Sequence, residues 1–279
     1  MRTDPFDVQP MRSQGSRRAP TFAASAENYD RMINWPARLA REIPFLERVF
    51  GPPGALGLLD AACGTGRHAL AMGERGYRVL GTDASEEMLK AARRLVRPLR
   101  PPVRFLRAAF GELARKAPGP YDGAYCIGNS LAAAGTERVA RAALADFGRV
   151  VRPGGMLVLQ VINFAQVLRE AAGAGCIRGP QTAAFADREL VTFKVFAPAG
   201  NAVMVTNVTF WKQDQRWQKH VFVGRLFPIG AVALARWLSD AGFRVRERLG
   251  DYAGERFNAK TSADLIVVAQ RTPAARPGS

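Results

Sequence analysis

Short apolar runs alternate with segments of helical spacing from about residue 56 onward. Each run is bounded by glycine, proline or charge, which is typical of strands buried on both faces of a parallel sheet. We therefore expect strands at residues 56–61, 77–82, 103–108, 121–127 and 156–162, with helices at 67–73, 85–95 and 137–151. This alternation predicts βαβ units, and hence an α/β fold with a mostly parallel sheet.

The pattern changes after residue 163. Residues 183–228 are rich in Val, Phe and Thr with partial alternation, and turn residues interrupt them at Gly200-Asn201 and Asp214-Gln215. Such a pattern predicts an antiparallel meander inserted after the fifth strand. A helix at residues 229–241 and strands at 244–247 and 264–269 then close the chain and bring the main sheet to about seven strands.

Composition limits the class of protein. Hydrophobic residues make up 48% and charged residues 23% of the chain, as in ordinary globular proteins. No apolar run approaches the ~18 residues of a membrane span, and the first twenty residues lack the apolar stretch of a signal peptide. Three cysteines without a close pair argue against a disulfide framework or a zinc site. We expect a cytoplasmic protein without a membrane partner.

The net charge of +16 raises the question of a nucleic-acid partner. Only six of the 40 basic residues are lysine, and the arginines are scattered along most of the chain. The densest group, which lacks interleaved aromatic residues apart from Phe105, consists of Arg93, Arg94, Arg97, Arg100, Arg104 and Arg107. A solvated basic face explains this group better than a surface on which bases would stack.

The first predicted strand runs into Asp60-Ala-Ala-Cys-Gly-Thr-Gly66. Ligands of open α/β sheets bind at the carboxyl ends of the strands, near the point where strand order reverses. Gly64 and Gly66 allow a tight turn and close ligand approach, and the following helix presents free N–H groups. The second strand ends in Asp83, whose carboxylate can accept both hydroxyls of a ribose. These features predict a site for the adenosine half of a cofactor.

The same loop satisfies the glycine pattern of dinucleotide-binding proteins, since Gly64-Thr-Gly-Arg-His-Ala69 fits that fingerprint. Asp60 argues against a dinucleotide, because a carboxylate at the end of the first strand would repel a pyrophosphate. It would instead attract the ammonium group of a methionine moiety, directly or through water.

Four segments resemble, in the same order, the motifs of the class I S-adenosylmethionine-dependent methyltransferases. They are Asp60-Ala-Ala-Cys-Gly-Thr-Gly66, Gly81-Thr-Asp-Ala-Ser-Glu-Glu-Met88, Tyr121-Asp-Gly-Ala-Tyr-Cys-Ile-Gly-Asn-Ser130 and Val151-Arg-Pro-Gly-Gly-Met-Leu-Val158. The resemblance covers the chain from about Tyr29 to the end. It implies a Rossmann-like fold and S-adenosyl-L-methionine as cofactor, with Asp83 on the ribose and Met88 against the adenine.

Within this superfamily, Gly128-Asn129-Ser130 and Asn163-Phe164 are similar to the glycine N-methyltransferase-like group, which acts on small molecules. In that group an N-terminal Tyr and Arg close over the methionine end, and Tyr29 and Arg38 match this pair. The resemblance makes Asn129 and Tyr29 the candidate catalytic residues. It implies a cofactor site of Tyr29, Arg38, Asp60, Ala62, Gly64, Gly66, Asp83, Ala84, Met88, Ala109, Phe110, Ile127, Asn129 and Ser130.

Two departures from the family bear on adenine and on the substrate. Ala109 stands where many relatives place an Asp or Asn that contacts the adenine amino group, which leaves adenine to backbone groups and to Phe110. Residues 131–134 lack the polar or histidine residue common there, which argues against glycine itself as the substrate.

The two histidines, His68 and His220, are far apart in sequence and indicate no metal site. We expect His68 to be a helix-surface or packing residue.

The resemblance implies a methyltransferase that acts on nitrogen or oxygen of a small molecule. Displacement at a sulfonium requires chiefly that the acceptor is aligned with the methyl group in a water-poor site. Two alternatives stay open. RNA is one, motivated by the net charge, and a non-catalytic S-adenosylmethionine-binding protein is the other, motivated by Ala109 and residues 131–134. The methyl acceptor, the attacking atom and the oligomeric state are also open.

The same patterns divide the chain into parts. We expect a disordered basic tail at residues 1–22 and a cofactor-binding core with an N-terminal helical cap at 23–165. An antiparallel substrate lid is expected at 166–228, a helix and strands that complete the core sheet at 229–272, and a flexible tail at 273–279.

Overall fold

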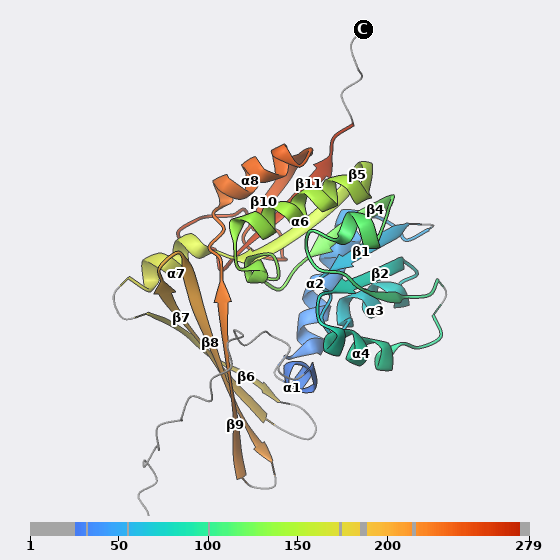
Figure 1. Cartoon of the computed structure of the whole chain (residues 1–279). Coiled ribbons are helices and arrows are strands. Elements are labelled where there is room, and N and C mark those ends of the chain that lie inside the picture. The colour runs from blue at the N-terminus through green and yellow to red at the C-terminus, as the bar shows by residue number, and fades with distance from the viewer. Residues whose placement is uncertain are drawn as a thin grey trace, which may run out of the picture.

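The computed structural model describes residues 26–31, 33–54, 56–99, 101–172, 175–184, 189–213 and 216–273. The expected tail at residues 1–22, and that at 273–279 apart from its first residue, lie outside the described residues. Two sheets organise the rest of the chain, a large core sheet and a smaller antiparallel sheet beside it (Figure 1).

The core sheet has seven strands in the order β10-β11-β5-β4-β1-β2-β3. The strands from β1 to β5 pair in parallel, whereas β11 is antiparallel to both of its neighbours. Their bounds are Gly57–Ala61 (β1), Arg78–Asp83 (β2), Arg104–Arg107 (β3), Tyr121–Cys126 (β4), Val151–Ile162 (β5), Phe243–Leu249 (β10) and Asp264–Arg271 (β11). This topology confirms the predicted fold class, a mostly parallel sheet of seven strands.

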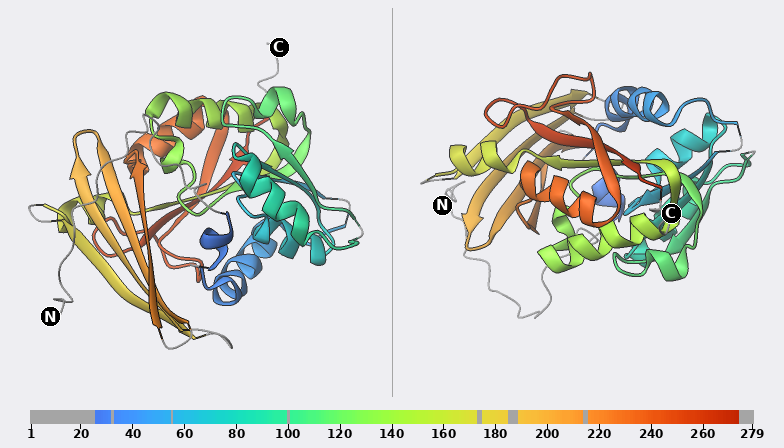
Figure 2. Two further views of the ribbon diagram at one scale, coloured as in Figure 1. Left: turned by 60° about the horizontal axis from the view of Figure 1, so that its bottom comes forward. Right: turned by 90° about the horizontal axis from the view of Figure 1, so that it is seen from above.

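Helices cover both faces of the core sheet (Figure 2). Ser85 begins one of them as predicted, since its hydroxyl accepts the N–H of Met88 at 3.3 Å and two glutamates follow in the first turn. The helices are α1 (Ala26–Arg31), α2 (Trp35–Phe50), α3 (Arg67–Glu74), α4 (Glu86–Leu95), α5 (Leu113–Lys116), the 3₁₀ turn η1 (Ala132–Ala134), α6 (Glu137–Val150), α7 (Phe164–Glu170) and α8 (Ala231–Asp240).

Alternate residues of each core strand point to opposite faces, which divides the hydrophobic core in two. On β11, Val267 packs with the cluster under α6 and α8, and Val268 packs with the cluster under α2 and α3. Both side chains are 1% exposed. Burial on both faces explains why the core strands appear in the sequence as continuous apolar runs.

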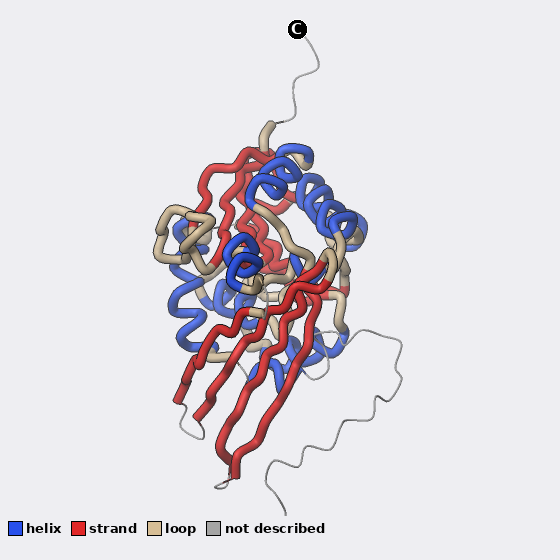
Figure 3. The backbone as a smooth tube through the Cα atoms, turned by 90° about the vertical axis from the view of Figure 1, so that its left-hand side faces the viewer, coloured by secondary structure: helices blue, strands red, loops and turns tan. Residues whose placement is uncertain are grey.

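The second sheet is antiparallel, with the order β6-β7-β8-β9, and its long strands stand in front of the core in Figure 3. Its strands are β6 (Cys176–Ala184), β7 (Glu189–Ala199), β8 (Ala202–Gln213) and β9 (Arg216–Leu226). The turn predicted at Gly200-Asn201 joins β7 to β8. The sheet begins earlier than the predicted residue 183, because Gly179-Pro180 and a register shift inside β6 hide that strand from a pattern search.

Residues 152–155, which separate the predicted helix at 137–151 from the predicted strand at 156–162, belong to β5. Tyr121 of β4 pairs with Val151, and Gly123 pairs with Met156, so the residues between them bulge out of the ladder. Gly154 has a φ of 79°, a left-handed conformation that glycine adopts without strain. Turn residues here form a bulge inside a strand.

No described helix is long and apolar enough to cross a lipid bilayer. Cys63, Cys126 and Cys176 are free thiols.

Candidate active site

The order of the core sheet reverses at β1, which lies between β2 and β4. Loops at the carboxyl ends of β1 and β4 therefore open toward the same crevice, where ligands of such sheets bind. The predicted cofactor residues lie in these loops, at the ends of β2 and β3, and in the helices α1, α2 and α4.

The loop after β1 turns through three left-handed residues, Ala62 (φ 59°), Gly64 (φ 56°) and Gly66 (φ 74°). A Cβ on Gly66 would lie 2.5 Å from the ring of Phe105, so only glycine fits there. A Cβ on Gly64 would meet the ring of Tyr29 at 3.9 Å. Ala62 holds its conformation at a cost of about 1 kcal/mol, because an L-residue with positive φ crowds its own carbonyl.

Asp83 joins the end of β2 to this loop. Its Oδ2 accepts the N–H of Gly64 at 2.9 Å, and its Oδ1 accepts the N–H of Ser85 at 2.8 Å. The carboxylate is thereby fixed in place and stays half-buried at the strand tip, with lone pairs left for a ligand. Its predicted neighbours differ in exposure, since Ala84 is exposed and Met88 is 4% exposed in the core.

Asp60, at the end of β1, is 3% exposed, and its Oδ2 has no hydrogen-bond partner among the described residues. Burial raises the pKa of Asp60 to about 8, and the neighbouring hydroxyl of Tyr125 offsets only part of this effect. The nearby charge of Asp83 raises the pKa of Asp60 further. A buried carboxyl oxygen without a partner is costly unless a ligand supplies one.

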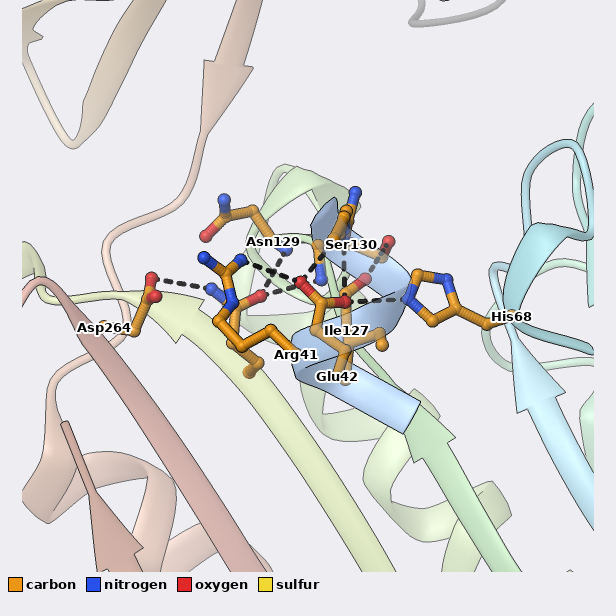
Figure 4. A network of polar contacts seen from close by, with 10 residues as sticks. Arg41, Glu42, His68, Ile127, Asn129, Ser130 and Asp264 are labelled. Carbon is orange, nitrogen blue, oxygen red and sulfur yellow. Dashed lines mark hydrogen bonds and ion pairs between the residues drawn. The ribbon is translucent and has the colours of Figure 1, made fainter. Parts of the chain in front are cut away.

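Helix α2 brings a buried ion network to the same place (Figure 4). Glu42 is 2% exposed, and its Oε1 accepts hydrogen bonds from Nε of Arg38 at 3.0 Å and from Nη2 of Arg41 at 3.2 Å. Its other oxygen lies 2.7 Å from Nε2 of His68, in the first turn of α3. The ring of His68 is buried, which lowers the pKa of His68. His68 is therefore a packing residue, not a helix-surface residue.

Helix α1 is fastened to the loop after β1 through Asp30. Its Oδ1 accepts hydrogen bonds from Oγ1 of Thr65 at 2.5 Å and from Nε1 of Trp35 at 3.1 Å. Its Oδ2 forms an ion pair with Nη2 of Arg67 at 2.6 Å. The neighbouring Tyr29 thus faces Gly64, and burial raises the pKa of Tyr29.

The loop after β4 is held by a residue of β5. Gln160 Oε1 accepts the N–H groups of Gly128 at 2.7 Å and Asn129 at 3.2 Å, while its Nε2 donates to Asp264 at 2.7 Å. Asn129 has a φ of 67°, and its Oδ1 accepts the N–H of Ile162 at 2.5 Å. These bonds rigidify the loop beside the expected methyl end.

Arg38 connects the helical cap to this loop. A Cβ on Gly128 would lie 3.0 Å from Nη2 of Arg38, so the guanidinium packs directly on the loop backbone. Ser130 closes the loop on itself, because its hydroxyl donates to the carbonyl of Ile127 at 2.9 Å. The structure therefore brings Tyr29, Arg38 and the loops after β1 and β4 together.

The residues expected at the adenine make fewer side-chain hydrogen bonds. The N–H of Ala109 donates to Oε2 of Glu112 at 3.0 Å, and Phe110 is half-buried beside it. Phe110 and its backbone are thus positioned after β3, at the same edge of the sheet as Asp83.

Sequence reasoning missed three residues that organise the site, Asp30, Glu42 and Gln160. Gln160 left a readable signal, since it is a polar residue inside the otherwise apolar run of residues 156–162. Glu42 left another, because it interrupts the buried face of α2 beside Ile43.

Comparison with known proteins relates this part of the chain to a protein family. A model described as a methyltransferase domain matches residues 58–155, the segment that contains both strand-tip acids and the loop after β4. Residues 58–155 are thus a methyltransferase domain, and the predicted resemblance to the class I S-adenosylmethionine-dependent methyltransferases is confirmed. S-adenosylmethionine is the cofactor of this chain.

Two curated relatives are similar in sequence. The glycine/sarcosine N-methyltransferase of Parasynechococcus marenigrum (strain WH8102) is 28% identical over 226 residues, which is 81% of this chain and 76% of that enzyme. The glycine/sarcosine N-methyltransferase of Aphanothece halophytica is 33% identical over 144 residues, and the match spans 52% of this chain and about half (54%) of that enzyme.

Solved structures share the fold. The CcbJ methyltransferase of Streptomyces caelestis superposes with a TM-score of 0.72 at 21% identity, covering 89% of this chain and 96% of that one. CalS10 of Micromonospora echinaspora, an amino pentose methyltransferase solved with the cofactor bound, has a TM-score of 0.66 at 22% identity, covering 92% and 100%.

The residues of this methyltransferase fit its cofactor. The partnerless Oδ2 of Asp60 offers an acceptor to a cation, and the Asp83 carboxylate retains acceptor capacity for hydroxyl groups. Gly64 leaves space between the loop and Tyr29 that a larger side chain would narrow.

Proposed function

We propose that this chain transfers a methyl group from S-adenosylmethionine to a nitrogen or oxygen atom of a small molecule. The observation that carries the proposal is the pair of acids at adjacent strand tips, Asp60 with a buried oxygen lacking a partner and Asp83 bound to the Gly64 loop. The names of the curated relatives, both glycine/sarcosine N-methyltransferases, favour nitrogen as the attacking atom.

Different residues would bind different parts of the cofactor. Asp83 would hold the ribose hydroxyls, Phe110 and the backbone after β3 would hold the adenine, and Asp60 would face the ammonium group. Tyr29 and Arg38 would close the methionine end, since α1 and α2 bring both side chains to the loops after β1 and β4. The remaining proposed cofactor contacts are Ala62, Gly64, Gly66, Ala84, Met88, Ala109, Ile127, Asn129 and Ser130.

The bound cofactor supplies an activated methyl group, so the chain has chiefly to orient the acceptor and exclude water. Asn129 is suited to this task because Gln160 and Ile162 fix its loop. The antiparallel sheet β6–β9 would cover the acceptor as a lid. The residue that follows β9 bonds to the 3₁₀ turn η1 after β4, since the N–H of Phe227 donates to the carbonyl of Ala132 at 2.9 Å.

A methyl-transfer assay with labelled cofactor tests the proposal. The acceptor panel contains glycine, sarcosine, amino sugars, phenols and RNA, and calorimetry measures cofactor binding in parallel. We expect binding together with turnover on at least one small amine or hydroxyl compound. Label found only in RNA would overturn the small-molecule assignment. Cofactor binding without turnover across a wide panel would indicate a non-catalytic binding protein.

A further inference from the structure

A lysine interrupts the buried face of the second sheet. On β7 the residues that point inward are Leu190, Thr192 and Phe196, which are at most 8% exposed, and Lys194 occupies the position between the last two. Alternate residues of a strand share one face, so Lys194 lies on this inward face and is half-buried there.

The residues beside Lys194 on the neighbouring strands form a row. Lys194 pairs with Arg178 of β6 and with Asn207 of β8, and Asn207 pairs with Phe222 of β9. Directly opposite residues of antiparallel strands point to the same face. Three polar side chains therefore share this face. The row on one side, through Phe196 and Val205, is apolar, and the row on the other side, through Thr192 and Thr209, is polar.

This row contains polar groups without partners. Arg178 is engaged, because its Nη2 donates to Gln166 at 2.9 Å and to Glu170 at 3.2 Å. The side chain of Lys194, by contrast, makes no hydrogen bond or ion pair with any residue that the structure describes. Oδ1 of Asn207 is buried and likewise has no partner among those residues. Burial of polar groups without partners is costly, and a ligand would remove the cost.

Charges of both signs lie near Lys194. Arg38 of α2 and Asp264 of β11 are its electrostatic neighbours on other elements of the fold. Arg38 is bound by Glu42, and Asp264 accepts Gln160, the same side chain that holds the loop of Asn129. Lys194 forms no ion pair with the described residues, although it lies near the proposed cofactor residue Arg38. Burial and the charge of Arg38 lower the pKa of Lys194, and the charge of Asp264 offsets part of this effect.

We propose that Lys194 binds an anionic group of the methyl acceptor, a carboxylate or a phosphate, while Oδ1 of Asn207 accepts a hydrogen bond from the same molecule. The proposal rests on the proposed function, because it names the class of acceptor. A charge-assisted bond to Lys194 would select acceptors that carry an anion and would orient them from the side of the sheet β6–β9.

Calorimetry on the chain saturated with S-adenosylhomocysteine tests this assignment. The probes are glycine and sarcosine as carboxylates, O-phosphoethanolamine as a phosphate, and glycinamide and ethanolamine as counterparts that keep the amine but lack the anionic group. Three variants are compared with the parent chain: Lys194→Met, Lys194→Arg and, as a matched control, Lys212→Met, whose lysine is exposed on β8 of the same sheet.

We expect at least one probe with an anionic group to bind more tightly than its counterpart without one. Lys194→Met should weaken that binding about tenfold to a hundredfold, the contribution of one charge-assisted bond, and Lys194→Arg should restore most of it. Lys212→Met should have no effect, and S-adenosylhomocysteine should bind all variants equally, which verifies folding.

Equal binding of probes with and without an anionic group, or binding of the anionic probes that is unchanged in Lys194→Met, would overturn the assignment of Lys194. Turnover only on amines that lack an anionic group would have the same effect and leave the proposed function standing. Lys194-dependent anion binding without methyl transfer would instead support the anion site and count against the proposed function.

Discussion

The carboxylate of Asp30 accepts the hydroxyl of Thr65 at 2.5 Å, across 35 residues of chain. This bond, with the ion pair to Arg67 at 2.6 Å, fastens α1 onto the loop that follows β1. Because Tyr29 precedes Asp30 on the same short helix, the position of Tyr29 over Gly64 depends on this attachment.

Replacing Asp30 by alanine should therefore loosen the cap. We expect Asp30→Ala to weaken S-adenosylmethionine binding about tenfold, because α1 would lose a charge-assisted pair of bonds to the loop. Calorimetry measures the affinity. Asp240→Ala is the control, since Asp240 makes an exposed ion pair with Arg141 far from the site, and its affinity should equal that of the parent chain. Equal affinities for all three proteins would show that α1 has no part in cofactor binding.

The buried network of Glu42 should dominate the stability of the helical cap. Glu42→Gln removes the charge that offsets Arg38 and keeps the volume of the side chain. We expect the free energy of unfolding to fall by about 3 kcal/mol, as when one partner of a buried ion pair is lost. Urea denaturation measures the loss. The control is Glu47→Gln on the same helix, whose exposed pair with Arg75 should contribute less than about 1 kcal/mol. Equal losses in the two variants would contradict the prediction.

Asp83 should contribute to cofactor affinity directly. We expect Asp83→Ala to weaken S-adenosylmethionine binding about tenfold to a hundredfold, the loss of one charge-assisted pair of bonds. Asp83→Asn keeps an acceptor for the N–H of Gly64. A loss of affinity in this variant therefore reports lost ribose contacts and not a disordered loop. An affinity that does not change in either variant removes Asp83 from the proposed site.

Asp60 should make stability depend on pH. Its pKa in the folded chain is about 8, above the ordinary 3.8, so folding favours the protonated carboxyl. The stability that this group contributes is fully present below the ordinary pKa and is lost as pH rises toward about 8. Asp60→Asn removes the titrating group. Between about pH 6 and pH 9, the parent chain without cofactor should lose about 2 kcal/mol more unfolding free energy than the variant. Urea denaturation at the two pH values measures this difference, and parallel losses would contradict it.

Local patterns predicted much of this fold. The strands β1, β2, β4 and β11 are apolar runs between turn residues, and the cap at Ser85 is a local hydrogen bond, so neither needs knowledge of distant residues. The strand-tip positions of Asp60 and Asp83 followed from those strands.

Other features depend on partners far along the chain, which spacing does not reveal. Glu42 meets His68 across 26 residues, and Gln160 meets Asp264 across 104. The strand β6 was missed because Gly179-Pro180 interrupts its pattern, and the predicted fifth strand began too late because the bulge in β5 contains proline and glycine. Periodicity predicts which side chains are buried, but not what they touch once buried.

The second sheet has a consequence for divergence within the family. All four of its strands come from one uninterrupted stretch between α7 and α8, whereas the strand-tip acids come from β1 and β2. Recombination at two points, after α7 and before α8, would exchange the whole four-stranded sheet and leave the first two strands untouched. A chimaera built in this way would test whether the sheet β6–β9 carries the acceptor preference.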